Sequence, residues 1–300
     1  MDTRQQLRAE IHALYAREHA ELGEAGTYRL LDEARRWDLS ATVAAGGVLV
    51  FPHAGVKECG HQIAAAVNAC LDSGVERVVV ISVLHAFTEE MEDARIRVSR
   101  GGDPAHEAQW GIQGSGIAGP QTWRDDHALT SWRHFWAAET KRRGIKGPQV
   151  IERYPWLVAG EPERLPGIEE LARLCEGAAV VSTEDAYHHG LGYGDPDFVA
   201  RYPHDGGLAL ARRSIEKGIA VLAAGDYWGW NQHCVVGKSD ARDAGAVYRY
   251  LRGPMTGRII DLTSCDTTEL YKAPPPTWVA TALLEWKNDR FWPWSSLLDF

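Results

Sequence analysis

The sequence lacks the features that mark a membrane-spanning or secreted protein. Its longest uncharged apolar run, residues 39–52, is too short to span a bilayer and has alanines and glycines in its middle. The first residues are polar, and no apolar stretch follows a basic start, so we find no secretory signal. We therefore expect a soluble cytoplasmic protein without a membrane partner.

Paired cysteines and a surplus of basic residues are also missing. An odd number of cysteines without any Cys-x-x-Cys pair fits neither a disulfide framework nor a structural zinc knuckle. The net charge is -9, from 32 Lys and Arg against 41 Asp and Glu, whereas nucleic-acid-binding proteins usually carry a basic face. We therefore expect no nucleic-acid partner. The five cysteines are Cys59, Cys70, Cys175, Cys234 and Cys265.

What is present is the composition of an ordinary globular protein. The 300 residues, 45% of them hydrophobic, suffice for a large core, and no repeat, low-complexity tract or linker divides them. We expect a single domain over residues 1–300. Apolar residues at three- and four-residue spacing, among them Leu7, Ile11 and Leu14, predict two amphipathic helices within 2–37. This N-terminal segment, 1–38, should pack on the core.

Short apolar runs alternate with helical patterns over the rest of the chain. Residues 47–51 and 77–83 are such runs, and the helical pattern over 60–73 between them indicates a parallel crossover. The alternation predicts an α/β fold with a mostly parallel central sheet and helices on both faces. The further predicted strands are 178–182, 258–262 and 278–285, and the further predicted helices lie around 126–143, 166–176, 206–218 and 240–252.

Candidate metal ligands follow the predicted strands. In an open α/β sheet, ligands bind just beyond the carboxyl ends of the strands. His53, His85 and His188 each come after one of the predicted strands. Each histidine alone could be a polar cap of a strand end, but three at one sheet edge favour a shared site.

A third ligand is available after strand 258–262. Cys265 offers a thiolate there, and Glu269, four residues later, is the alternative if its loop turns inward. Two imidazoles with a thiolate or a carboxylate leave coordination positions open, which a metal needs when substrate or dioxygen binds to it. The pattern therefore favours a catalytic site over a structural one.

Two further features concern how enclosed the site is. The glycine-rich segment 101–119 has no periodicity and predicts a loop over the site. The chain also has 12 tryptophans, which either line a pocket or pack in the core and on the surface. An enclosed pocket would favour an enzyme. The clustered tryptophans are Trp228, Trp230, Trp286, Trp292 and Trp294.

Three blocks of the sequence resemble the Memo family. Residues 51–60, Phe-Pro-His-Ala-Gly-Val-Lys-Glu-Cys-Gly, are similar to its Pro-His-Ala-Gly block. Residues 182–190, Ser-Thr-Glu-Asp-Ala-Tyr-His-His-Gly, resemble its Ser-Ser-Asp-Phe-x-His-x-Gly block, and residues 263–266, Thr-Ser-Cys-Asp, resemble its closing Cys-containing block. The order and approximate spacing of the blocks agree over most of 40–286.

Memo proteins share their fold with the LigB-type class III extradiol dioxygenases. Those enzymes hold non-haem Fe(II) with two His and one Glu and use another His as acid/base. Carried over to this chain, the resemblance implies His53, His85 and Cys265 as metal ligands, His188 as the acid/base, Asp185 as an orienting or polarising carboxylate and His127 on the pocket wall.

The chain also departs from the family pattern. Val56 replaces the aromatic residue after Pro-His-Ala-Gly, and His85 stands in Leu-His-Ala where the family has a paired His-His. Cys265 agrees with Memo, whereas the dioxygenases have Glu at this position. A thiolate is softer and more electron-donating than a carboxylate, so it favours copper or a thiolate-ligated iron over simple catechol ring cleavage.

The expected function is that of a metal-dependent oxidoreductase. The leading expectation is a non-haem Fe(II) dioxygenase-type enzyme that acts with O2 on a small aromatic or otherwise electron-rich substrate. The alternatives are a Memo-like copper- or iron-binding redox protein without turnover and a zinc-dependent hydrolase with the same ligands. The sequence leaves the substrate, the metal and homo-oligomerisation open.

Overall fold

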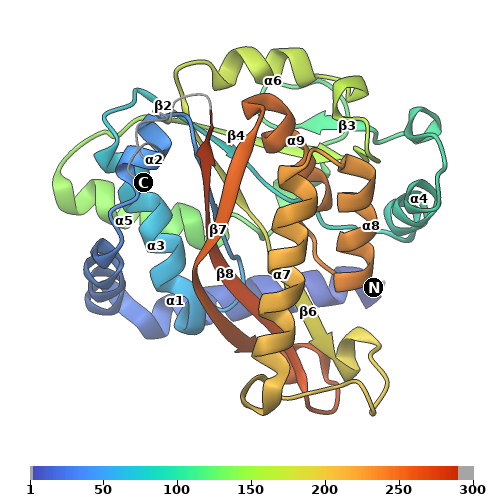
Figure 1. Cartoon of the computed structure of the whole chain (residues 1–300). Helices are drawn as coiled ribbons and strands as arrows, with labels where there is room; N and C mark the ends of the chain where they lie inside the picture. The colour runs from blue at the N-terminus through green and yellow to red at the C-terminus, as the bar shows by residue number, and fades with distance from the viewer. Residues whose placement is uncertain (1–2, 290–300) are drawn as a thin grey trace, which may run out of the picture.

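The computed structural model describes residues 3–289 and places eight strands in one sheet (Figure 1). The strands are β1 (Val48–Phe51), β2 (Arg77–Ile81), β3 (Gly111–Gln113), β4 (Gln149–Trp156), β5 (Ala179–Thr183), β6 (Tyr187–Gly190), β7 (Met255–Asp266) and β8 (Thr277–Asn288). Their spatial order is β3-β4-β2-β5-β1-β8-β6, and β7 pairs with β8. The central strands β4, β2, β5 and β1 are parallel, as predicted, but antiparallel pairs on both sides make the sheet mixed.

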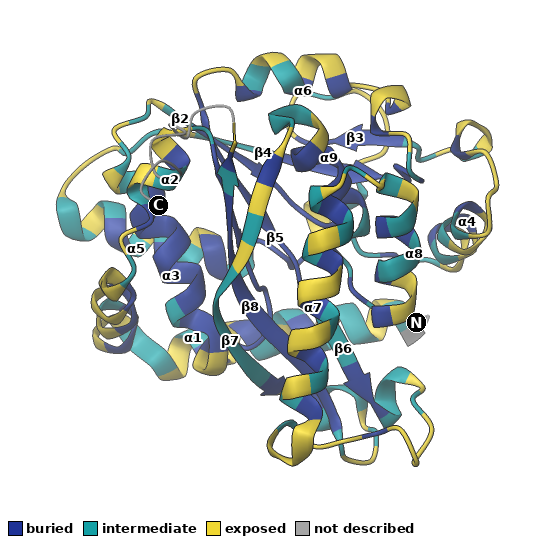
Figure 2. Cartoon of the chain, in the orientation of Figure 1, coloured by how far each residue is buried: buried dark blue, intermediate teal, exposed yellow. Residues whose placement is uncertain are grey.

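Alternate residues of the central strands belong to two apolar clusters, each shared with a different set of helices. Leu49 and Phe51 of β1 pack with α1, α3 and α5, whereas Val48 and Val50 pack with α7, α8 and α9. Successive side chains of a strand point to opposite faces, so a strand buried on both faces is apolar throughout. Figure 2 shows β5, one of these strands, in the dark blue of buried residues. The helices are α1 (Thr3–Glu33), α2 (Ser40–Ala44), α3 (Val56–Asp72), α4 (Glu89–Ser99), α5 (Thr130–Arg143), α6 (Ile168–Cys175), α7 (Leu208–Ala223), α8 (Tyr227–Gly237), α9 (Arg242–Arg252) and α10 (Thr268–Tyr271).

The N-terminal helical segment is interrupted once. At Gly23 the backbone has φ 61° and ψ -176°, which is not helical, so α1 consists of two helical stretches in sequence. A positive φ of this kind is accessible to glycine at little steric cost. Across residues 3–289, no helix combines the length and the apolarity that crossing a bilayer requires.

Several elements have no counterpart in the sequence pattern, namely α2, α4, α8, α10, β3, β4 and β6. The segment 101–119, predicted as a loop, contains β3, which pairs with β4. A strand of three residues is too short to show a period, and β4 carries Glu152 and Arg153 in its middle. Pairing with a neighbour, not local alternation, therefore defines these strands.

The parallel strands β2, β5 and β1 end at the same edge of the sheet. In their register, Phe51 of β1 lies beside Thr183 of β5, and Ile81 of β2 lies beside Ser182. The segments that follow these strands therefore begin side by side. This edge is the place where an α/β sheet binds its ligands.

Helices α1 and α5 meet at a pair of stacked histidines. The ring centroids of His19 and His134 are 4.2 Å apart, with 10° between the planes. His19 Nε2 is 3.0 Å from Ser131 Oγ, and His134 Nε2 is 3.0 Å from Thr27 Oγ1. Burial, and then the neighbouring His134, lowers the pKa of His19 to about 4, and burial also lowers the pKa of His134. Two neutral rings thus join the N-terminal helix to α5.

Acid should weaken this contact. The unfolded chain protonates these histidines below a pH of about 6.5, whereas His19 in the folded protein stays neutral down to about pH 4. The unfolded state then binds more protons, so the free energy of unfolding falls as the pH falls through this window. Replacing His19→Gln should remove on the order of 1 kcal/mol of this pH dependence, a value reduced for the partial exposure of the ring.

Thermal unfolding measured between about pH 7.5 and 4.5 checks this prediction. The exposed His106 provides a matched control, since His106→Gln should leave the pH dependence of the wild type unchanged. Equal slopes in His19→Gln and the wild type would contradict the prediction.

Candidate functional site

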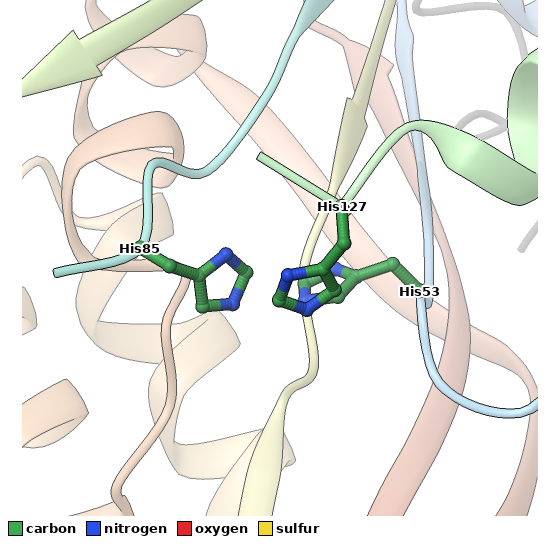
Figure 3. Close-up of side chains that lie close together, drawn as sticks. All are labelled: His53, His85 and His127. Atoms are coloured by element: carbon green, nitrogen blue, oxygen red, sulfur yellow. The ribbon is translucent and has the colours of Figure 1, made fainter. Parts of the chain in front are cut away.

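Three histidines from separate segments converge beyond this sheet edge (Figure 3). His53 follows β1, His85 follows β2, and His127 precedes α5. Nitrogen atoms that could bind a metal, one from each ring, lie within 4.8 Å of one another. The rings of His85 and His127 stack with centroids 4.2 Å apart, and His53 meets His85 edge-on at 5.2 Å. The structure thus groups His127, predicted on the pocket wall, with the two histidines predicted as ligands.

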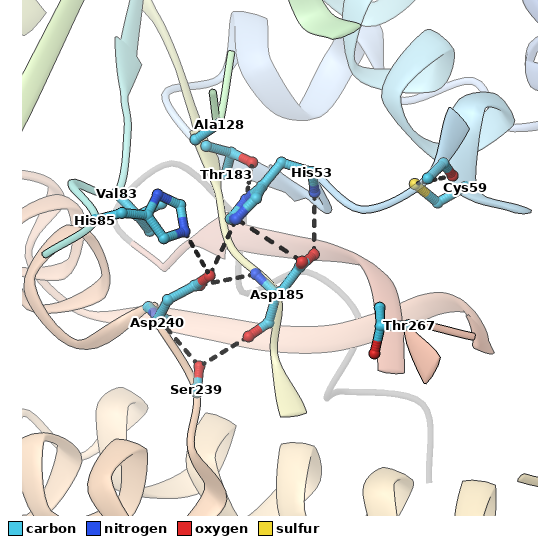
Figure 4. A network of polar contacts seen from close by, with 12 residues as sticks. His53, Cys59, Val83, His85, Ala128, Thr183, Asp185, Ser239, Asp240 and Thr267 are labelled. Atoms are coloured by element: carbon cyan, nitrogen blue, oxygen red, sulfur yellow. Dashed lines mark hydrogen bonds and ion pairs between the residues drawn. The ribbon is translucent and has the colours of Figure 1, made fainter. Parts of the chain in front are cut away.

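A carboxylate that the sequence pattern did not single out lies between two of these histidines. Oδ2 of Asp240 is 3.0 Å from Nε2 of His53 and 3.7 Å from Nε2 of His85. Figure 4 shows Asp240 between the two rings. The residue comes from the connection between α8 and α9, where no strand ends and no motif marks it. The expectation that ligands follow strands therefore could not identify Asp240.

The other ring nitrogen of each histidine is held by a hydroxyl or a carboxylate. His53 Nδ1 is 3.0 Å from Thr183 Oγ1. His85 Nδ1 is 3.1 and 3.2 Å from the two carboxylate oxygens of Asp126, and the His85 backbone N–H donates to the same carboxylate at 2.7 Å. Metal-binding histidines usually have such a partner, because it fixes the tautomer and the orientation of the ring. This leaves Nε2 of both rings directed at Asp240.

The backbone of His53 is held as firmly as its ring. Its N–H donates to Asp185 Oδ1 at 3.1 Å, and its carbonyl oxygen accepts a hydrogen bond from the Tyr15 hydroxyl. Asp185 Oδ2 lies 3.8 Å from His53 Nε2, and the backbone N–H of Asp185 donates to Asp240 Oδ1 at 2.8 Å. His53, Asp185 and Asp240 form a second group whose donor atoms lie within 4.8 Å of one another. Asp185 thus contacts both the backbone and the ring of His53, for which an orienting role stays a prediction.

The carboxylates dominate the protonation of the site. Burial by itself lowers the pKa of His85, but Asp126 and Asp240 outweigh burial and raise the pKa to about 10. Asp185 and Asp240 likewise overcome burial and raise the pKa of His53. Burial and the charge on His85 hold the pKa of His127 well below its ordinary value. Protons and a metal cation therefore compete for the same nitrogens of His53 and His85.

The site opens into a cavity of about 1270 Å³, whose lining includes His85, His127, His188 and Asp240. His188 lies on β6 itself, and its buried Nδ1 has no hydrogen-bond partner among residues 3–289. Its ring packs edge-on against Tyr193, with centroids 4.8 Å apart. Burial lowers the pKa of His188 although Asp240 and Asp185 oppose this, so the ring is neutral and able to accept a proton.

Cys265 is not brought together with the histidines. In the part of the chain that the structure describes, it belongs to neither group of donor atoms around His53, and its Sγ lies 3.7 Å from Glu58 Oε2. Burial, and then Glu58, raises the pKa of its thiol. β1 pairs with β8 only as far as Leu284, whereas Cys265 pairs with Val279. The long β7–β8 pair therefore carries the cysteine beyond the end of β1.

The other predicted elements of the pocket lie elsewhere or at its rim. Glu269 lines the cavity but belongs to neither donor group. No residue of 101–119 and no tryptophan within residues 3–289 lines the cavity. Aromatic side chains of another kind, Tyr15, Phe87, Tyr193 and Tyr271, take that place. Of the clustered tryptophans, Trp230 and Trp286 are buried in the core, Trp228 is exposed, and Trp292 and Trp294 lie outside the described residues.

Comparison with known proteins assigns no family, because no family model matches the chain and no curated protein shows significant similarity to it. A function for the site rests on the chemistry of its own side chains.

Proposed function

We propose that this chain is a metal-dependent oxidoreductase that holds non-haem Fe(II) with His53, His85 and Asp240. The supporting observation is the position of Asp240 Oδ2, 3.0 Å and 3.7 Å from the Nε2 atoms of the two histidines. Two donor atoms that each bind one ion at about 2.1 Å are at most about 4.2 Å apart, and both separations from Asp240 meet this limit. One nitrogen of His53 and one of His85 lie within 4.8 Å of each other. Two imidazoles and one carboxylate with open positions are the ligand set of non-haem Fe(II) oxygenases.

When bound, Fe(II) supplies the chemistry with dioxygen that amino-acid side chains do not provide. The chain's own residues orient the ligands and move a proton. Thr183 and Asp126 hold the rings of His53 and His85 through Nδ1. His188, whose side chain lines the cavity and whose pKa burial lowers, accepts a proton from a hydroxyl or amino group of the substrate. The substrate class that fits is a small aromatic or otherwise electron-rich molecule.

A second function, zinc-dependent hydrolysis, is favoured by the three-histidine group. One nitrogen each from His53, His85 and His127 lies within 4.8 Å of the others. Catalytic zinc sites commonly have three protein ligands and keep a fourth position for water, and three histidines form one such set. The identity of the metal and the requirement for oxygen separate the two functions.

Anaerobic purification, metal analysis and oxygen-uptake measurements test the proposal. We expect stoichiometric iron and oxygen consumption with at least one member of a panel of catechols, aminophenols and indoles. Zinc, with activity unchanged in the absence of oxygen, would favour the hydrolase. Copper without oxygen uptake would favour a Memo-like metal-binding protein without turnover.

The third ligand can be identified with two variants. Asp240→Asn should lower iron affinity by more than the roughly 10- to 100-fold that is lost when a residue orienting a ligand is replaced. Cys265→Ser should retain its iron, since the sulfur lies beside Glu58 and outside both donor groups. Metal content after dialysis against graded chelator measures both. Retained iron in Asp240→Asn together with loss in Cys265→Ser would assign the third position to the cysteine.

The role of Asp126 can be tested against its neighbour in the sequence. Asp126→Asn should lower iron affinity by roughly 10- to 100-fold, because it weakens the contact that fixes the His85 ring. Asp125→Asn is the matched control, since the side chain of Asp125 is 63% exposed and pairs with Arg8. Equal affinities in the two variants would argue against an orienting role for Asp126.

His188 can be tested independently of metal binding. His188→Gln should bind iron like the wild type but lower the rate of oxygen uptake by roughly 10²- to 10⁴-fold, the usual contribution of a general acid or base. Metal analysis and the pH dependence of the rate distinguish loss of proton transfer from loss of the metal. Undiminished oxygen uptake in this variant would refute the acid/base assignment.

A further inference from the structure

A partly buried arginine lines the same cavity as the candidate metal centre. Arg242 is the first residue of α9 and is among the residues that line the cavity. It follows Asp240 by two positions, so the Cα atoms of the two residues are at most about 7 Å apart. Arg242 and the histidines His85, His127 and His188 therefore line the same cavity.

Within residues 3–289, the guanidinium of Arg242 has no carboxylate partner at ion-pair distance, and its Nε is buried without a hydrogen-bond partner. The carboxylate of the adjacent Asp243 instead accepts the Val158 backbone N–H at 2.7 Å. Glu92, another nearby carboxylate, pairs with Arg95 at 2.5 Å. A guanidinium remains charged in proteins, and a buried charge is costly unless a partner compensates it. The wall of the cavity therefore holds a positive charge for which the protein provides no direct partner.

We propose that Arg242 binds a carboxylate group of the substrate, so that the substrate is a small organic acid. This inference rests on the proposed function, in which the remainder of the same molecule reaches the metal ligands. The two parallel N–H groups of a guanidinium match the two oxygens of a carboxylate, which a lysine cannot reproduce. One unpaired guanidinium also balances the single charge of a carboxylate better than the higher charge of a phosphate monoester.

The acidic residues of the cavity influence how the substrate is oriented. Glu18, Glu58 and Asp266 also line the cavity, and Glu18 and Glu58 both approach Gly55. Carboxylates repel an anionic group, so an organic acid is excluded from that part of the wall. Specificity of this kind combines an attractive contact with a repulsive one. Arg242 thus acts as a residue that determines both the orientation and the charge of the substrate.

Calorimetric titration of the metal-free protein with benzoate tests the inference, with benzamide as the uncharged probe of similar shape. Benzoate should bind roughly tenfold or more tightly than benzamide. Arg242→Gln should lower benzoate affinity roughly tenfold or more. Arg242→Lys should give an intermediate loss, because lysine keeps the positive charge but lacks the two parallel N–H groups of the guanidinium. Arg97→Gln is the matched control, since Arg97 pairs with Glu107 and does not line the cavity.

A variant expected to increase benzoate affinity tests the inference in case Arg242→Gln does not fold. Glu92→Gln removes a carboxylate near Arg242 but also removes an ion-pair partner of Arg4 and Arg95, which line the same cavity. It should tighten benzoate binding, and the gain should persist when Arg4 and Arg95 are also replaced by Gln. Equal benzoate affinity in the wild type, Arg242→Gln and Glu92→Gln, or no binding by the wild type at millimolar concentration, would overturn the inference. Tighter binding of phenyl phosphate than of benzoate would overturn the assignment to a carboxylate. The titration measures neither metal binding nor turnover. Its result can therefore be interpreted even if the Fe(II) proposal fails.

Discussion

The pairing of buried carboxylates with imidazoles is the interaction on which the candidate site depends. His53 and His85 each approach Asp240 through Nε2, while Thr183 and Asp126 hold the opposite nitrogens. Neither the acids nor the histidines could be buried alone at acceptable cost, because an isolated charge loses its hydration. Together they form a compact network in which opposite charges lie close to one another. A cation that replaces protons in this network meets donors that are already oriented.

The scaffold makes this pairing possible by bringing distant segments to one edge. Strands β2, β5 and β1 are neighbours, parallel and in a register that aligns their last residues. Apolar packing on both sides of these strands holds their ends in place. Segments without regular structure, such as those that carry His127 and Asp240, bring their side chains to the same edge of the sheet. The rigid part of the fold sets the position, and the connections supply much of the chemistry.

Under the proposed function, the cavity combines three kinds of group with separate roles. The candidate metal ligands would bind the ion and His188 would transfer a proton, while tyrosines and Arg242 line the same cavity. The choice between Fe(II) and Zn²⁺ depends on whether Asp240 or His127 completes the ligand set with His53 and His85. Both alternatives use the same two histidines. The function therefore depends on a difference of one donor atom.

The local sequence pattern by itself determined the α/β class, the parallel central strands and the histidines at their ends. Strands buried on both faces are continuously apolar, and residues at strand ends follow these apolar runs directly in the sequence. His53 and His85 could be found in this way. Only the tertiary structure decided that Asp240 approaches them and that Cys265 does not. Asp240 follows a helix, so no local period indicates its partners, and the position of Cys265 depends on how far β7 and β8 extend past β1. Contacts between remote segments are set by register and packing, which a single stretch of sequence does not encode.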